Sequence, residues 1–149
     1  AKAALAPFER GAAGENPFAV QNELQDVMQD LVGIVRIEGE MRLALEKINA
    51  LRARAAKAGI TGNIEYNTGW HTALDLDNML EISEMIALAA IERKESRGGH
   101  FRDDYPDKSA DWGEFDLRIS QGGDGQPHLT RGPVAPLPEE SKHVIGACT

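Results

Sequence analysis

The sequence of residues 37–59, IEGEMRLALEKINALRARAAKAG, decides the fold. Its apolar residues recur at alternating steps of four and three, the heptad-like spacing of a helix that packs against other helices. These positions are Ile37, Met41, Ala44, Ile48, Leu51, Ala55 and Ala58. Arg52, Arg54 and Lys57 fall in the last turns, where cations oppose the negative end of the helix dipole. Because Gly59 is a typical helix stop, the segment predicts one long amphipathic helix.

A helix is also expected before this segment. Asn16 and Pro17 are a typical helix start, because Asn can accept from free N–H groups and Pro fits the first helical position. The following apolar residues again recur at steps of three and four, up to a stop near Gly33. They are Val20, Leu24, Val27, Met28 and Leu31.

A third helix is expected after a loop. Residues 59–69 are rich in Gly and Asn and predict the loop, and Asn67 or Thr68 should cap a helix over about residues 70–95. Residues 85–91 are seven apolar residues in a row, so this part of the helix must be covered on all sides. Two partner helices cover only part of that circumference. We therefore infer that another surface packs on the second half of the third helix.

The pattern predicts a mainly α fold, a three-helix antiparallel bundle similar to a spectrin repeat, over residues 17–97. Residues 1–16 are rich in Ala and Gly and are interpreted as a linker. Residues 98–149 are expected to form a loop, a short hairpin and an extended tail. The hairpin strands are an alternating segment at 115–119 and a return strand near 128–130, joined by a glycine-rich turn.

The composition limits the classes of function. The 149 residues carry a formal net charge of −8, with 42% hydrophobic and only 5% aromatic residues. The acidic balance argues against binding nucleic acid or anionic lipid, because both need a basic face. The single cysteine, Cys148, excludes an intramolecular disulfide framework and multi-cysteine metal sites, and favours a reducing compartment. No apolar run could span a bilayer, and the first residues lack a signal-peptide pattern.

The densest cluster of polar residues, RKESRGGHFRDD, occupies residues 93–104 at the predicted exit of the third helix. One interpretation is an anion or carboxylate clamp, because a guanidinium can donate two parallel hydrogen bonds to such a group. On composition alone we favour the alternative. In it, Arg97 and Arg102 pair with neighbouring acids and bind carbonyls at the helix end, which locks a turn.

Two histidines raise the question of catalysis or metal binding. His71 and Asp75 are four residues apart on one helical face, but two ligands are too few for a metal. His100 and Asp104 could act as an acid–base pair, yet no Ser or Cys nucleophile stands beside them in the sequence. No glycine-rich dinucleotide loop follows a strand. The residues favour a scaffold without a metal. The alternatives are a stand-alone helical interaction module, and a small hydrolase or metalloenzyme that uses His71, His100 and nearby acids.

The helix exit resembles a motif of a known family. Residues 93–106, RKESRGGHFRDDYP, are similar to the R-x-E-S-R-G-x-H-x-R-x-D-[YF]-P stretch of the succinate dehydrogenase/fumarate reductase flavoprotein family. LQDVM at 24–28 and GIVR at 33–36 resemble that family's LQ-x-x-M and G-x-x-R segments. Trp112 and the pair Pro133–Val134 stand where succinate dehydrogenase members carry their C-terminal arm.

This resemblance covers about residues 17–134 and implies the C-terminal helical domain of an FAD-dependent oxidoreductase. Such subunits take a hydride from succinate to give fumarate, or run the reverse, and pass electrons to an iron–sulfur subunit and a quinone. Their FAD-binding fingerprint, flavin-linking histidine and catalytic residues belong to other domains. No catalytic or cofactor-binding residue is therefore assigned here, FAD is expected only in the full-length subunit, and residues 1–16 would lead in from an FAD domain.

The resemblance also implies partners. The bundle is expected to pack on its own FAD domain and to lie near the iron–sulfur subunit, at the inner face of the cytoplasmic membrane. No contact with nucleic acid or with the membrane itself is expected, and an exposed apolar face favours a homodimer of the isolated chain. The expected interface residues are Arg36, Glu95, Ser96, Arg97, Gly98, His100, Arg102 and Asp104.

Two departures from the family pattern leave the subfamily open. Gly99 stands where many members have Ala, and Gly-Glu-Phe follows Trp112 where Lys-His is common. L-aspartate oxidase and adenylylsulfate reductase share the E-S-R-G-x-H theme and are the alternatives. The long arm after the helix exit favours succinate dehydrogenase.

Overall fold

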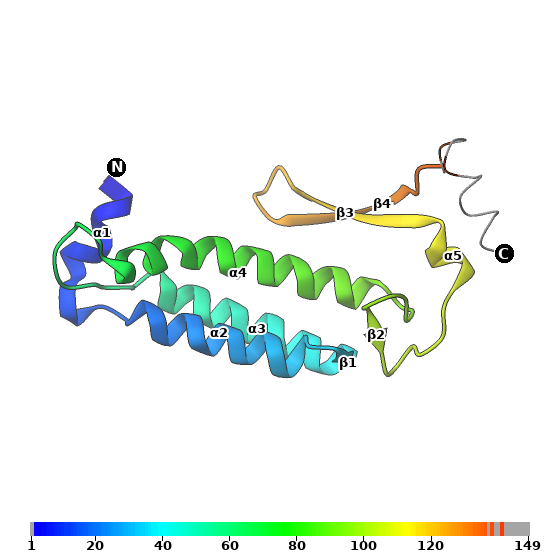
Figure 1. Ribbon diagram of the computed structural model, residues 1–149, viewed down its shortest axis with the longest axis horizontal. Coiled ribbons are helices and arrows are strands. Elements are labelled where there is room, and N and C mark those ends of the chain that lie inside the picture. Colours follow the sequence, from blue (N-terminus) through cyan, green and yellow to red (C-terminus); the bar gives the residue numbers. More distant parts are fainter. Residues whose placement is uncertain (1, 137, 139–140, 142–149) are drawn as a thin grey trace. The chain divides into compact units, whose positions relative to one another are not determined.

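Three long helices form the core of the structure, a computed structural model that describes residues 2–136, 138 and 141. They are α2 (Pro17–Leu31), α3 (Glu38–Ala55) and α4 (Thr68–Glu92). Each of the three packs against the other two, and consecutive helices run in opposite directions (Figure 1). The predicted mainly α fold with a three-helix antiparallel bundle is therefore confirmed.

Both α2 and α4 begin at an asparagine cap, as predicted. The side-chain oxygen of Asn16 accepts a hydrogen bond from the Phe18 N–H at 3.0 Å. The side-chain oxygen of Asn67 accepts one from the Trp70 N–H at 3.1 Å. These bonds satisfy N–H groups that have no acceptor within the first turn of a helix, so they fix where each helix starts.

The core between the helices is aliphatic. Its buried side chains include Val20, Leu24, Val27, Ala44, Ile48, Leu51, Leu76, Leu80 and Ala87. The seam predicted for α3 faces this core, because every one of its positions except Ile37 is buried. Ile37 lies just before the first turn of α3 and is exposed. The spacing of apolar residues therefore predicted the core-facing side of the central helix.

The first residues form a helix where we had predicted no element. α1 (Lys2–Arg10) is followed by the short 3-10 helix η1 (Gly11–Ala13). The carbonyl of Ala4 accepts a hydrogen bond from the indole N–H of Trp70 at 2.7 Å, and the rings of Phe8 and Trp70 lie 5.6 Å apart. α1 thus packs on the start of α4. The role of residues 1–16 as a linker to another domain stays a prediction.

Gly14 and Gly59 let two chain segments cross closely between η1 and the end of α3. Two backbone hydrogen bonds of 2.9 Å join the segments, from Glu15 N to Lys57 O and from Gly59 N to Glu15 O. A Cβ atom on Gly14 would lie 2.4 Å from the Cα of Gly59, and a Cβ on Gly59 would lie 2.6 Å from the Cα of Gly14. Glycine is therefore required at both positions.

A short parallel sheet joins two segments that are far apart in the sequence. β1 (Val35–Arg36) pairs with β2 (Phe101–Arg102), so that Val35 lies opposite Phe101 and Arg36 lies opposite Arg102. Successive side chains of a strand point to opposite faces. The exposed Val35 and Phe101 therefore share one face, and the two arginines share the other. The sequence did not predict this sheet, which brings Arg36 to the exit of α4.

The chain divides into two compact units. The first ends at Lys108 and holds α1, the bundle and the parallel sheet. The second contains the short helix α5 (Ala110–Gly113) and the strands β3 (Phe115–Gln121) and β4 (Pro127–Pro133), which pair antiparallel. The predicted hairpin is thus confirmed, with its turn at the glycine-rich residues 122–125.

Some predictions concern residues beyond those that the structure describes. Cys148 lies there, as does most of the tail that was expected to be extended. Within the described part of the chain, no helix combines the length and the apolar character needed to cross a membrane.

Candidate interface at the exit of α4

The chain leaves α4 through a compact turn, residues 93–107, which we call the elbow. Arg102 lies at its centre with a fully buried side chain. Its Nη1 donates hydrogen bonds to the carbonyl oxygens of Ala90, Ile91 and Arg93, at 2.8, 3.1 and 3.3 Å. These carbonyls lie at the C-terminal end of α4, where acceptors lack partners and the helix dipole is negative. The guanidinium of Arg102 therefore caps α4.

The other side of the Arg102 guanidinium binds Asp104. Nε and Nη2 of Arg102 donate to the two carboxylate oxygens of Asp104, each at 2.7 Å. Asp104 Oδ2 also accepts a hydrogen bond from the backbone N–H of Glu38, the first residue of α3, at 3.1 Å. The hydrogen bonds from Arg102 lower the pKa of Asp104 to about 2. This carboxylate is therefore ionised throughout the physiological range.

A second buried charge, Glu95, lies between two arginines. Its Oε1 accepts from Nε of Arg97 at 3.0 Å, and its Oε2 accepts from Nη2 of Arg97 at 3.1 Å. Arg93 also forms an ion pair with Oε1. Glu95 is fully buried, whereas the side chain of Arg97 is 41% exposed. The hydrogen bonds to Glu95 raise the pKa of Arg97, so the guanidinium of Arg97 stays charged.

Ser96 and the residues after it close the turn. The Ser96 hydroxyl oxygen accepts from the backbone N–H of Arg102 at 2.8 Å, and the hydroxyl donates to the carbonyl of Tyr105 at 2.9 Å. Arg97 and His100 exchange two backbone hydrogen bonds, of 2.8 and 3.0 Å. Gly98 between them has φ of +59°, a conformation that favours glycine. The family motif is thus a locally bonded turn.

His100 connects the elbow to β1. Its Nδ1 lies 2.8 Å from Nη1 of Arg36, and its Nε2 lies 3.1 Å from the carbonyl oxygen of Arg93. Nε of Arg36 in turn donates to the carbonyl of Val32, just beyond α2, at 3.1 Å. Burial is the main cause that lowers the pKa of His100, and the cations of Arg36 and Arg102 add to it. The ring is therefore neutral at pH 7.

The structure brings together all the residues predicted for the interface, because each lies in the elbow or bonds to it. The arginines pair with acids of the same chain, as we had favoured on composition. Glu38 and Arg93 also take part but were not among the expected interface residues, although Arg93 begins the polar cluster found in the sequence. Glu38 could have been noticed as an acid in the first turn of α3, but no sequence pattern indicated that this turn contacts the elbow.

The other histidine candidate is not part of this site. His71 and Asp75 are exposed on α4. Among the residues that the structure describes, no group of three or more His, Cys, Asp and Glu side chains could hold a metal ion. The elbow itself contains no Ser or Cys aligned with His100 as a nucleophile, because the Ser96 hydroxyl is bonded to the backbone of Arg102 and Tyr105.

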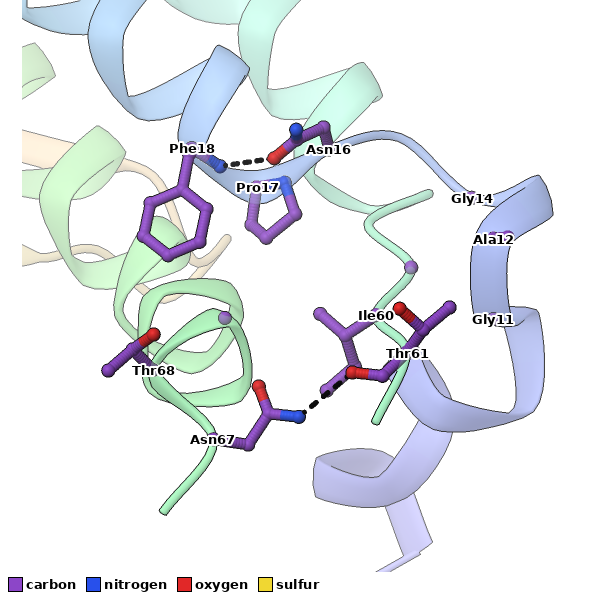
Figure 2. Close-up of a pocket in the computed structure, with 12 residues that line it drawn as sticks. Gly11, Ala12, Gly14, Asn16, Pro17, Phe18, Ile60, Thr61, Asn67 and Thr68 are labelled. Atoms are coloured by element: carbon purple, nitrogen blue, oxygen red, sulfur yellow. Dashed lines mark hydrogen bonds between the residues drawn. The ribbon is translucent and has the colours of Figure 1, made fainter. Parts of the chain in front are cut away.

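A pocket of about 410 Å³ lies at the other end of the bundle, between the starts of α2 and α4 (Figure 2). None of the residues that line it carries a charge, and most of them are small or apolar. The side chains of Asn16 and Asn67 at its rim already cap the two helices. Asn67 also donates to the carbonyl of Thr61 at 3.0 Å. The pocket therefore offers no catalytic group.

A family model described as "Fumarate reductase flavoprotein C-term" matches residues 21–142. The chain belongs to this family. The match includes α3, α4, the elbow and both strands of the hairpin. It confirms the resemblance and makes the chain a C-terminal domain of the succinate dehydrogenase/fumarate reductase flavoproteins.

Relatives of this fumarate reductase flavoprotein C-terminal domain include whole oxidoreductase subunits. The succinate dehydrogenase flavoprotein subunit of Coxiella burnetii is 32% identical over 139 residues, which are 92% of this chain and 23% of that subunit. L-aspartate oxidase of Yersinia pestis is 39% identical over 87 residues, 58% of this chain and 15% of that enzyme. The Mycobacterium smegmatis Sdh1 complex in the apo form matches with a TM-score of 0.76 and 46% identity, over 87% of this chain and 22% of that chain. The chain thus spans less than a quarter of the length of these relatives.

Proposed function

We propose that this chain is the C-terminal part of an FAD-dependent oxidoreductase that interconverts succinate and fumarate. The observation that carries the proposal is the extent of the match to a succinate dehydrogenase subunit, 92% of the chain, together with a bundle whose charged residues bind one another. In this enzyme FAD binds outside these residues and takes the hydride from succinate. The electrons pass to an iron–sulfur subunit and a quinone, and this chain supplies no catalytic group.

We propose a structural role for the chain, in which the outer side of α4 packs on the FAD domain. Ile82 and Ile86 lie on this side four residues apart, and are 57 and 45% exposed. Side chains three and four residues apart share one face of a helix. We call these two residues the apolar stripe. Apolar side chains grouped on one helix face support a covering partner more strongly than scattered ones.

The elbow would lie at the edge of the same interface. Arg36, Glu95, Ser96, His100, Arg102 and Asp104 hold its shape through the contacts given above. Arg97 and Gly98 are exposed and would contact the neighbouring domain or the iron–sulfur subunit. A fixed turn presents these two residues at little cost in conformational entropy. The elbow would therefore help to hold the FAD domain in its working geometry.

The subunit would lie at the inner face of the cytoplasmic membrane, attached through its partner subunits. The net charge of −8 opposes direct binding to anionic lipid or to nucleic acid. The apolar stripe, when its partner is absent, would favour self-association of the 149-residue chain. Each of these expectations rests on the membership of the chain in the flavoprotein family.

L-aspartate oxidase is a second candidate, because the Yersinia pestis enzyme is 39% identical to this chain. That match covers only 87 residues, whereas the match to the succinate dehydrogenase subunit covers 139. The longer match favours succinate as the substrate of the whole protein. An enzyme that oxidises aspartate would need no quinone-linked iron–sulfur subunit, so the two candidates also differ in their partners.

The experiment is to purify the polypeptide that carries this chain from its natural source, with an antibody raised against the 149 residues. We expect bound flavin, an associated iron–sulfur subunit, and dye reduction that depends on succinate. The same preparation supplied with aspartate or with adenylylsulfate is the control for the alternative subfamilies. A flavin-free polypeptide, or turnover of aspartate without turnover of succinate, would overturn the proposal.

A further inference from the structure

The contact between Arg36 and His100 fixes the protonation state of the imidazole ring. A guanidinium can only donate hydrogen bonds, so the Nδ1 atom at 2.8 Å from Arg36 must be the unprotonated acceptor. A carbonyl can only accept, so the Nε2 atom at 3.1 Å from the Arg93 oxygen must carry the hydrogen. Both contacts require the neutral ring with its proton on Nε2.

We propose that His100 is a proton-controlled contact that holds β1 against the elbow when the ring is neutral and releases it when the ring is protonated. A proton on Nδ1 would remove the acceptor for Arg36 and place a second cation within 2.8 Å of its guanidinium. In a partly buried site this repulsion is weakly screened. The ring and Arg36 would therefore separate.

The charged groups around the ring favour this outcome. Those that lower the proton affinity of His100 come from three segments packed against it: Arg36 in β1, Arg93 at the end of α4 and Arg102 in β2. The nearby acids are each bound to an arginine: Glu95 to Arg93 and Arg97, Asp104 to Arg102, and Glu38 to Arg42, with Arg102 also close to Glu38. Among the residues that the structure describes, the two ring nitrogens bond to Arg36 and to the carbonyl of Arg93, and to no carboxylate. A protonated ring would therefore have no counter-ion in direct contact within this part of the chain.

The structure limits how far the release would spread. β1 and β2 are two residues long and are extended by one further bond, from Asp103 N to Arg36 O at 2.9 Å. Arg36 also binds the carbonyl of Val32 at the end of α2. His100 is not one of the buried residues that form the core of the bundle. Protonation should therefore open the segments around residues 32–37 and 100–103 and leave the three helices folded.

The direction in which pH changes the stability of the contact follows from the pKa of His100 in the folded and unfolded chain. The pKa of His100 is lowered in the folded chain relative to its ordinary value of 6.5. The contact therefore contributes fully above about pH 6.5 and is lost as the pH falls through the lower folded pKa. Asp104, with a pKa of about 2, stays ionised over this range and cannot produce the same response.

The test is hydrogen exchange of the 149-residue chain at about pH 7.5 and about pH 5, expressed as protection relative to the intrinsic rate. We expect protection at residues 35–37 and 101–103 to fall by about tenfold for each pH unit between the unfolded and folded pKa of His100. Protection in the middle of α3 should stay unchanged. The His100→Gln chain should lose the pH response, because glutamine can accept from Arg36 and donate to the carbonyl without titrating.

His71→Gln is the matched control, since His71 is exposed on α4, and it should keep the response of the unaltered chain. An equal loss of protection in the His100→Gln chain would overturn the proposal, as would unchanged protection while the His100 ring titrates. Ring nitrogen chemical shifts of the unaltered chain give an independent readout. They should show the proton on Nε2 near pH 7.5, and a charged ring or a proton on Nδ1 would overturn the proposal even if the variant fails to fold.

Discussion

Arg102 and Asp104 form one ion pair that joins the ends of two antiparallel helices. The guanidinium of Arg102 binds three carbonyls at the C-terminal end of α4, and the carboxylate of Asp104 accepts the first N–H of α3. Each charge thus faces the helix end whose dipole has the opposite sign. The pair holds the elbow against the bundle more firmly than an isolated surface ion pair could.

Asp104→Asn should destabilise the chain by about 2 kcal/mol at pH 7. The pKa of Asp104 is about 2 in the folded chain and 3.8 in the reference state, and each unit corresponds to about 1.4 kcal/mol. Because the pKa is lowered on folding, this stability is present above about pH 3.8 and is lost as the pH falls towards 2. Urea unfolding of both chains at pH 7 and near pH 2 measures the difference. An equal difference at both pH values would contradict this account.

Arg102→Lys should cost about 3 kcal/mol, although the charge is kept. An ammonium group cannot bind both oxygens of Asp104 and also reach the carbonyls of α4, so buried acceptors lose their donors. Arg42→Lys is the matched control, because Arg42 pairs with Glu38 on an exposed face of α3. That change should alter the free energy of unfolding by less than about 0.5 kcal/mol. Similar losses in the two variants would show that the planar geometry at Arg102 is unimportant.

The bundle could be predicted from the sequence because its signals are local. Helix starts depend on a cap such as Asn16, and the core depends on the periodic apolar residues of each helix. Arg36 and His100 are 64 residues apart in the sequence, and their pairing depends instead on where the end of α2 lies relative to the end of α4. No pattern in the sequence gives the position of one helix end relative to the other. The composition therefore indicated a locked turn at the exit of α4, but it did not indicate that Arg36 would bind to this turn.

α1 was missed for a related physical reason. Residues 1–16 are rich in Ala and Gly, a composition typical of a linker, and Pro7 lies inside the helix, where proline is disfavoured. α1 is held in place by tertiary contacts, those of Ala4 and Phe8 with Trp70. Such contacts override weak local preferences.

Gly98→Ala should destabilise the chain by about 1 kcal/mol, whereas Gly99→Ala should be close to neutral. Gly98 has φ of +59°, a conformation in which a Cβ atom is strained, although nothing lies within 4 Å of it. Gly99 also has open space around it and is not among the glycines with positive φ. Thermal unfolding of the two variants compares backbone strain alone. A larger loss for Gly99→Ala would reverse the assignment.

Arg97→Ala, in the whole flavoprotein, should weaken subunit association or flavin retention more than it slows hydride transfer. Arg97 is 41% exposed and is held by Glu95, so it presents a fixed cation at the surface of the elbow. The measurements are the flavin content after gel filtration and the single-turnover rate with succinate. Unchanged association with a lost hydride-transfer rate would place Arg97 in the catalytic machinery instead.

Replacing Ile82 and Ile86 together with Gln should leave the free energy of unfolding of the 149-residue chain within about 1 kcal/mol of its original value, because both side chains are largely exposed. The same double change should reduce self-association of the isolated chain and binding of the FAD domain, since each buried isoleucine contributes about 1.5–3 kcal/mol. Leu80→Gln on the buried side of α4 is the control, and it should unfold the chain. Sedimentation equilibrium measures the first effect and flavin retention in the whole protein measures the second. If the double variant associates as strongly as the original chain, the apolar stripe is not the contact surface and the partner of α4 must lie on another face.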